Sequence, residues 1–141
     1  MYPIRPWLYV GKYRETLDYN LLHTSQINAM MQLAKSVQPP NISSLFIAIE
    51  DGKPLPFDHL KTGVEFVQLE KARGRNVLIA CGAGISRAAS FAIATLKEEE
   101  NLSLLDAFWQ VRAKHPEAMP HPALWQSLCE YYSENVPHPD W

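Results

Sequence analysis

A cysteine and an arginine six positions apart, Cys81 and Arg87, are the residues of this chain whose types and spacing could do chemistry together. The five residues between them include Gly82 and Gly84. Backbone amides of a tight, glycine-containing loop can point inward and bind an anion. A thiolate among such amides is a nucleophile, and a guanidinium offers a planar fork of donors that fits two oxygens of a phosphoryl group. The spacing therefore indicates a site at which sulfur attacks a bound oxyanion.

The sequence on either side of this loop predicts the elements that such a site needs. The apolar residues 77–80 indicate a buried strand, and the small and apolar residues 88–96 indicate a helix. The positive end of a helix dipole at such a junction favours bound anions and the thiolate form of Cys81. The alternative is a buried cysteine that packs at a strand end, with Arg87 in solvent. Strand, glycines and helix together favour the anion site.

The loop resembles the signature of the cysteine-dependent phosphatases, and in particular that of their small dual-specificity branch. This signature is His-Cys, then five residues, then Arg and a hydroxyl residue. Cys81, Gly84, Ser86 and Arg87 fit it, and residues 83–87 closely match the Ala-Gly-x-Ser-Arg form of that branch.

The resemblance covers nearly the whole chain. Residues 6–11 are similar to the family's opening strand, residues 49–52 are similar to its acid loop, and the helices expected after residue 88 fall where the family places its own. The resemblance implies one phosphatase-like catalytic domain, residues 1–141, of the α/β class. Its central, mostly parallel sheet of four to five strands would be flanked by helices.

The order of the predicted elements agrees with this class. Strands are expected at residues 7–10, 44–49 and 76–80, and helices at 16–23, 57–73, 88–99, 103–114 and 121–132; residues 27–33 have mixed periodicity, and the resemblance implies a strand there. Strands that alternate with helices predict a parallel sheet whose ligands bind beyond the carboxyl ends of the strands. Cys81 and Asp51 both follow a predicted strand, so we expect both at that edge.

The resemblance also implies a role for each residue of the site. Cys81 would attack phosphorus and form a phosphocysteine, while Arg87 and the loop amides stabilise the oxygens. The implied phosphate-binding residues are Gly82, Ala83, Gly84, Ile85, Ser86 and Arg87. Asp51 would protonate the departing oxygen and then activate the water that hydrolyses the intermediate.

Asp51 is the candidate acid because it follows a predicted core strand and lies in a loop rich in glycine and proline. It also matches the acid aspartate of the family. An aspartate before a glycine, here Gly52, is a frequent turn as well. The rival carboxylates are Glu50 and Asp58, and Asp58 is better explained as an early residue of the following helix.

Two positions depart from the family's pattern. Ala80 stands where the family has the histidine that orders the cysteine, and Ala88 stands where it has a hydroxyl that supports the departing sulfur. We expect these changes to affect turnover more than phosphate binding, because the loop amides, the helix end and the arginine remain. Ser86 and Ser90 are candidates to replace the missing hydroxyl in part.

The composition and net charge of the chain limit the classes of function that are expected. The chain has 141 residues, 47% of them hydrophobic and 20% charged, which is typical of one globular domain. A net charge of -2 gives no general attraction for nucleic acid or an anionic membrane. There is no apolar run of about 18 residues and no leader pattern, so we expect a cytoplasmic protein.

Other conspicuous residues have structural interpretations. Cys129 lies far from Cys81 in sequence and is expected as a buried structural thiol. Three aromatic residues at helical spacing, Phe108, Trp109 and Trp125, are expected in the core. The five histidines form no ligand pattern and are expected in loops or at the surface; they are His23, His59, His115, His121 and His138. No metal or other cofactor is called for.

Three functions remain open. The first is a phosphatase that hydrolyses phosphomonoesters, with protein phosphotyrosine as substrate and phosphoserine or phosphothreonine as further substrates. The second is a phosphate-binding pseudophosphatase with little turnover, which the changes at Ala80 and Ala88 would favour. The third is sulfur transfer or arsenate reduction, which is disfavoured because Cys129 is the one other cysteine available as a resolving thiol. The sequence names neither the physiological substrate nor the oligomeric state.

Overall fold

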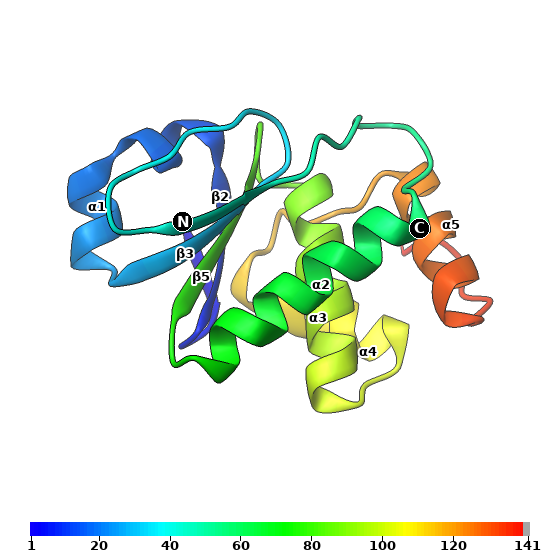
Figure 1. The fold of residues 1–141 in the computed structure, drawn as a ribbon. Coiled ribbons are helices and arrows are strands. Elements are labelled where there is room, and N and C mark those ends of the chain that lie inside the picture. Colours follow the sequence, from blue (N-terminus) through cyan, green and yellow to red (C-terminus); the bar gives the residue numbers. More distant parts are fainter. Residues whose placement is uncertain (140–141) are drawn as a thin grey trace.

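The computed structural model of the chain describes residues 1–139, so the last two residues of the expected domain lie outside the described part. Its architecture is a sheet with helices on both faces (Figure 1). The strands are β1 (Tyr2–Arg5), β2 (Leu8–Lys12), β3 (Ile27–Gln32), β4 (Ser43–Phe46) and β5 (Asn76–Cys81). The helices are η1 (Tyr13–Leu17), α1 (Tyr19–Thr24), α2 (Phe57–Ala72), α3 (Arg87–Glu100), α4 (Leu104–Lys114) and α5 (Pro122–Tyr132).

The five strands are arranged in the order β1-β2-β5-β3-β4. β2, β5, β3 and β4 run parallel, and β1 is antiparallel to β2. The predicted α/β class with a mostly parallel sheet is therefore confirmed. β5 lies at the centre, and Lys12 at the end of β2 pairs with Cys81 at the end of β5. The carboxyl ends of β2 and β5 thus meet at the edge where the site was expected.

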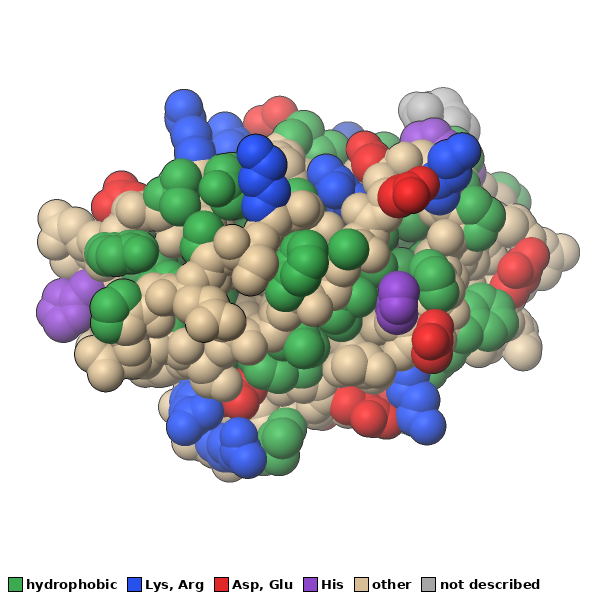
Figure 2. Space-filling model, turned by 45° about the horizontal axis from the view of Figure 1, so that its top comes forward, with side chains coloured by type: hydrophobic (Ala, Val, Ile, Leu, Met, Phe, Trp, Pro, Cys, Tyr) green, Lys and Arg blue, Asp and Glu red, His purple; other side chains and the backbone are tan. Residues whose placement is uncertain are grey.

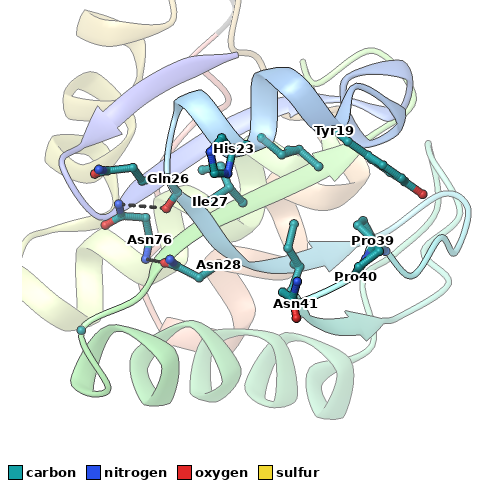
Figure 3. A pocket seen from close by; sticks show the side chains of 12 residues that line it. Tyr19, His23, Gln26, Ile27, Asn28, Pro39, Pro40, Asn41 and Asn76 are labelled. Atoms are coloured by element: carbon teal, nitrogen blue, oxygen red, sulfur yellow. Dashed lines mark hydrogen bonds between the residues drawn. The ribbon is translucent and has the colours of Figure 1, made fainter.

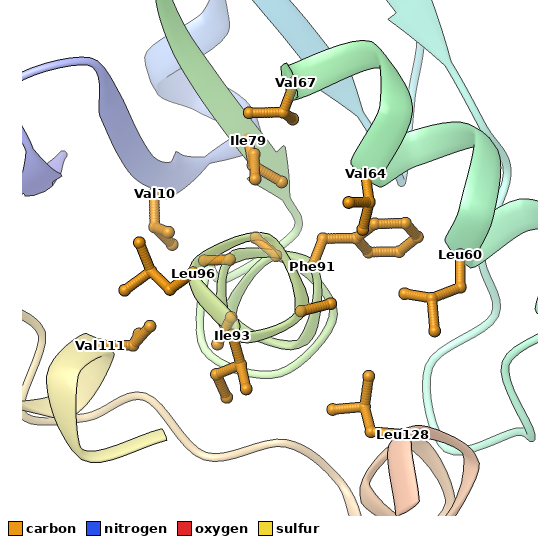
Figure 4. Close-up of a cluster of buried hydrophobic side chains, with 14 of the residues drawn as sticks. Val10, Leu60, Val64, Val67, Ile79, Phe91, Ile93, Leu96, Val111 and Leu128 are labelled. Carbon is orange, nitrogen blue, oxygen red and sulfur yellow. The ribbon is translucent and has the colours of Figure 1, made fainter. Parts of the chain in front are cut away.

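α2, α3, α4 and α5 lie on one side of the sheet and α1 lies on the other (Figure 1). α3 lies at the centre of the helical layer, where side chains of β2, β5, α2, α4 and α5 surround it (Figure 4). Residues 88–96 are buried without interruption, because this helix contacts neighbours on every side. The close approach to α2 depends on Gly63, where a Cβ would lie 2.4 Å from the Phe91 ring. α3 is therefore fixed in place, and so is the loop that leads into it.

The second face of the sheet has a smaller core under α1, formed by Leu22, Ile27, Met30, Leu78 and Ala80. Successive residues of a strand point to opposite faces. Ala80 consequently packs on this face, whereas Cys81 belongs to the large helical core.

The elements differ from the sequence prediction at three places, one of which is β4, which ends at Phe46 and not at residue 49. β1 was not predicted, and the helix expected at residues 16–23 is divided into η1 and α1 at Asp18, whose carboxylate caps α1 by accepting from Leu21 N at 3.0 Å. The prediction of Trp109 as a core residue was wrong, since its side chain is 46% exposed. Phe108 and Trp125 are buried as expected.

Candidate active site

Cys81 is the last residue of β5 and lies at the bottom of a pocket of about 260 Å³. The residue itself is 2% exposed. The backbone N–H of Ala88, in the first turn of α3, donates to Cys81 Sγ at 3.4 Å. The pocket is lined by Asp51, Cys81, Ala83, Ile85, Ser86 and Arg87. The structure thus brings the three expected catalytic residues together, and three further members of the expected phosphate-binding set with them.

The loop of residues 82–86, called the cysteine loop below, turns several of its carbonyl groups toward neighbouring segments that do not line the pocket. Three of them accept a hydrogen bond from another segment. These bonds run from Tyr13 N to Gly82 O (3.3 Å), from His115 Nε2 to Gly84 O (2.8 Å) and from Met119 N to Ile85 O (2.9 Å).

The geometry of a trans peptide determines where the amides of this loop point. In a trans peptide the N–H that follows a carbonyl points in the opposite direction. The N–H groups after the three outward carbonyls belong to Ala83, Ile85 and Ser86, and these three residues line the pocket. The amides therefore converge on a position above Cys81. Such a nest, together with the N-terminus of α3, binds anions.

Gly84 is the position at which the cysteine loop requires glycine. Its φ is +73°, and a Cβ there would lie 2.8 Å from the carbonyl oxygen of Gly11 in β2. Both the backbone conformation and the contact with β2 exclude a larger residue. Gly82, by contrast, is exposed, and neither glycine lines the pocket.

Arg87 begins α3, and its guanidinium reaches back across the cysteine loop. Nη1 donates to the carbonyl oxygen of Ile49 at 3.1 Å, and a Cβ on Gly82 would lie 3.1 Å from Nη2. The guanidinium therefore joins the cysteine loop to the backbone two residues before Asp51. A guanidinium has five N–H donors, so the bond to Ile49 leaves the fork able to bind an oxyanion in the pocket.

Asp51 lies in the exposed turn that follows β4. Gly52 continues this turn with φ +76°, and a Cβ there would lie 3.6 Å from Nε2 of His121. Of the carboxylates in residues 1–139, Asp51 alone lines the pocket. The rival Asp58 is in the first turn of α2, and its Oδ1 accepts from the neighbouring His59 N. This geometry favours Asp51 over its rivals.

The two serines considered as replacements for the missing hydroxyl make other hydrogen bonds. Ser90 Oγ donates to Ser86 O at 2.8 Å, and Ser86 Oγ accepts from His121 N at 2.8 Å. Within the described part of the chain, the hydrogen bond recorded for Cys81 Sγ comes from the Ala88 amide. The support of the sulfur is thus provided by the main chain.

One residue of the site was missed by sequence reasoning. His115 was expected in a loop or at the surface, but it is 1% exposed and its ring bonds Gly84 O. It directly follows α4, so local sequence gives no sign that it lies against a loop 31 residues earlier. His121, the N-cap of α5, is exposed as predicted.

A larger pocket of about 580 Å³ lies elsewhere, between α1, the start of β3 and the turn before β4 (Figure 3). It is lined by Tyr19, Leu22, His23, Gln26, Ile27, Asn28, Pro39, Pro40, Asn41, Ile42, Gly74 and Asn76. Because this lining contains neither lysine nor arginine, the pocket is poorly suited to a phosphoryl dianion. The smaller pocket at Cys81 is the candidate active site.

Charge outside the pocket offers little attraction for anions. Figure 2 brings the carboxyl ends of the strands toward the viewer and shows acidic and basic side chains mixed around hydrophobic and uncharged ones. Of the described residues that line the pocket, Arg87 is the one cationic residue, so Arg87 and the loop amides are the groups suited to an anion there. Within residues 1–139 no cluster of side chains suited to a metal ion was found, and no helix has the length and apolar character needed to cross a membrane.

The fold and the site together define a class of protein. It is an α/β domain in which a cysteine at the end of the central strand lines a pocket together with the loop that follows it and with the arginine that begins the next helix. Residues 8–134 match the model of the dual specificity phosphatase catalytic domain. The chain belongs to this family.

Individual relatives agree with this assignment. Dual specificity protein phosphatase 15 of Mus musculus is 30% identical over 134 residues, which cover 93% of this chain and 57% of the relative. The crystal structure of DUSP15 superimposes with a TM-score of 0.84 at 28% identity, covering 91% of this chain and 84% of that one. A mouse putative dual specificity phosphatase complexed with zinc tungstate superimposes with a TM-score of 0.86 at 25% identity, covering 94% and 86%.

Proposed function

We propose that this chain is a cysteine-dependent phosphatase that hydrolyses phosphomonoesters. The observation that carries the proposal is the position of Cys81 Sγ, which accepts from the Ala88 amide under a pocket that Arg87 and Asp51 also line. The nest would hold a tetrahedral dianion with its phosphorus above the sulfur. The tungstate complex of the mouse relative supports this choice of ligand, because tungstate is a tetrahedral dianion.

In the first step Cys81 attacks phosphorus and a phosphocysteine forms as the bond to the leaving oxygen breaks. The inward amides and Arg87 stabilise the equatorial oxygens, because they are in place before the charge develops. Asp51 gives its proton to the leaving oxygen. In the second step Asp51 takes a proton from water, the water attacks the phosphocysteine, and thiolate and inorganic phosphate are released.

The size of the pocket bears on the substrate. About 260 Å³ is small compared with the pockets of roughly 300 Å³ or more that enclose drug-sized ligands. The pocket would hold the phosphoryl group and the first atoms of the leaving group. We propose protein phosphotyrosine as the substrate class, with phosphoserine and phosphothreonine as further members.

Pre-steady-state hydrolysis of p-nitrophenyl phosphate tests the proposal. A phosphatase with slow phosphocysteine breakdown releases nitrophenolate in a burst equal to the enzyme concentration, followed by steady turnover. Absence of any release, while Cys81 still reacts with iodoacetate, would leave a phosphate-binding pseudophosphatase as the better description.

Replacing Asp51 with asparagine is expected to slow hydrolysis according to the leaving group. General acid catalysis contributes on the order of a hundredfold or more for basic leaving groups and little for acidic ones. The dependence of kcat/KM on leaving-group pKa should therefore become steeper in Asp51→Asn. Asp58→Asn is the matched control, because Asp58 lies outside the pocket in the first turn of α2. Equal losses across all leaving groups would assign the acid to another residue.

Replacing Ala88 with serine is expected to speed phosphocysteine breakdown. The amide of residue 88 already donates to the sulfur, so a hydroxyl on the same residue starts close to the departing thiolate. One charge-assisted hydrogen bond corresponds to a rate increase on the order of tenfold. The measurement is the steady rate after the burst. An unchanged rate, with breakdown limiting in both proteins, would contradict the expectation.

A further inference from the structure

We propose that His115 is a positioning residue of the anion site, whose Nε2–H holds the Gly84 carbonyl and thereby aims the Ile85 amide at the bound phosphoryl group. The inference deepens the proposed function and rests on it for the identity of the anion. His115 is 1% exposed, and the distance from its Nε2 to Gly84 O is 2.8 Å. This is a short hydrogen bond in a place shielded from water.

The hydrogen bond determines which ring nitrogen of His115 carries the hydrogen. A carbonyl oxygen can only accept, so the hydrogen is on Nε2. Nδ1 is buried and has no hydrogen-bond partner among residues 1–139. A buried polar atom without a partner is unfavourable for folding. One ring nitrogen of His115 is thus unsatisfied, and the other holds the cysteine loop.

The orientation of the imidazole is fixed by β1. The ring of Tyr2 stacks on it, with 3.8 Å between the ring centroids and 14° between the planes. Tyr2 pairs with Val10 of β2, the strand that runs beside β5. The stacking therefore links the edge of the sheet to the loop above Cys81.

Of the peptide groups in this loop, the one between Gly84 and Ile85 depends most on a hydrogen bond to fix its orientation. Glycine permits many backbone conformations, and Gly84 has φ +73°. The other two outward carbonyls are held by main-chain N–H groups, of Tyr13 and Met119. The Gly84 carbonyl is held by a side chain, so a substitution can release this peptide while leaving the other two in place.

The position of His115 also bears on Ala80. The family resemblance implies a loop-ordering histidine immediately before the cysteine, and this chain has a buried alanine there on the second face of the sheet. His115 reaches the loop from the helical side instead, at Gly84. The ordering of the loop is thereby supplied from a different part of the fold.

Tungstate titration by calorimetry, together with kcat/KM for p-nitrophenyl phosphate, tests the inference in variants of the whole chain. His115→Phe keeps an aromatic ring for Tyr2 but removes the donor. Tungstate affinity and kcat/KM are expected to fall by about ten- to a hundredfold, at or below the lower limit of the roughly hundred- to thousandfold range for losing an oxyanion donor outright, because the amide is displaced and not removed. His115→Gln retains an N–H of similar reach, and its affinity should stay within about threefold of the wild type.

Thr95→Val is the matched control. It removes another buried bond from a side chain to a carbonyl, Thr95 Oγ1 to Phe91 O at 2.8 Å, inside α3 and away from the loop. It should lower the melting temperature without changing tungstate affinity. If His115→Phe behaves in the same way, His115 has only a structural role and the inference is overturned.

Two further outcomes are decisive. If His115→Phe does not fold, Tyr2→Leu takes its place; weaker tungstate binding supports the inference, and unchanged binding overturns it. If the wild type binds tungstate in a His115-dependent manner but releases no nitrophenolate, the proposed function fails and the inference stands. A wild type that does not bind tungstate overturns the inference.

Discussion

Replacing Cys81 with serine is expected to abolish turnover while preserving the binding of tetrahedral oxyanions. The hydroxyl is a far weaker nucleophile than a thiolate, and among residues 1–139 the one carboxylate that lines the pocket is Asp51, which the proposal assigns to the leaving group and the water. The loss in kcat should be on the order of 10⁴-fold or more, as for other nucleophile deletions. Calorimetry should still detect tungstate, because the inward amides and Arg87 are untouched.

Cys129→Ser is the control for this variant. Cys129 is also buried, its Sγ donates to Val136 O, and burial raises the pKa of its thiol. It should remain protonated and unreactive, so the variant should keep full activity. Turnover retained in Cys81→Ser would require a different nucleophile. Loss of tungstate binding in the same variant would mean that the sulfur itself holds the loop together.

The part of the site that is formed by one continuous segment of the chain could be predicted from the sequence. β5, the cysteine loop and α3 follow one another within residues 76–100, and an apolar run, two glycines and a helical segment encode them in order. The strand predicted at 44–49 is confirmed only in its first part. β4 ends at Phe46, but Ile47 N and Ile49 N still bond to the backbone at the end of β3, so Asp51 follows an extended segment as expected.

The predictions that failed concern features that depend on contacts between segments far apart in the sequence. β1 is short and contains Pro3, which strands tolerate only at a sheet edge, so its pairing with β2 had no local signal. Trp109 was assigned to the core by helical spacing, but α4 buries Leu104, Ala107, Phe108 and Val111 and turns the next residue outward. His115 is buried because Tyr2 and Gly84 meet it there, and no pattern within α4 indicates this.

The bond from Arg87 to Ile49 gives the guanidinium a second role. The proposed proton transfer requires the carboxylate of Asp51 to stay at the pocket that Cys81 also lines, yet Asp51 lies in an exposed turn. The carbonyl of Ile49 is fixed to Arg87 at 3.1 Å. The same side chain that would bind the phosphoryl oxygens thus restrains the segment that leads to the proposed acid, Asp51. A change at Arg87 should therefore affect both binding and proton transfer.

Replacing Arg87 with lysine is expected to lower kcat/KM by on the order of 10²- to 10³-fold, the range for losing a preorganised transition-state donor. Lysine keeps the positive charge, but its ammonium lacks the planar fork and cannot bind two phosphoryl oxygens and the Ile49 carbonyl in the same geometry. Part of the loss should be in kcat, because the Asp51 turn loses its restraint, and the leaving-group dependence should become steeper as in Asp51→Asn. Steady-state kinetics with a series of aryl phosphates measures both the loss in kcat and kcat/KM and the dependence of the rate on leaving-group pKa.

Arg5→Lys is the matched control for this last change. Arg5 also uses its fork, since Nε and Nη2 donate to the two carboxylate oxygens of Glu100 at 2.8 Å each, but the pair lies at the surface away from the pocket. Exposed ion pairs contribute at most about 1 kcal/mol to stability, so this variant should keep its kcat/KM. If Arg87→Lys loses no more activity than Arg5→Lys, the charge of residue 87 suffices and its planar geometry has no role in the reaction. A loss confined to KM, with an unchanged leaving-group dependence, would separate phosphate binding by Arg87 from any influence on Asp51.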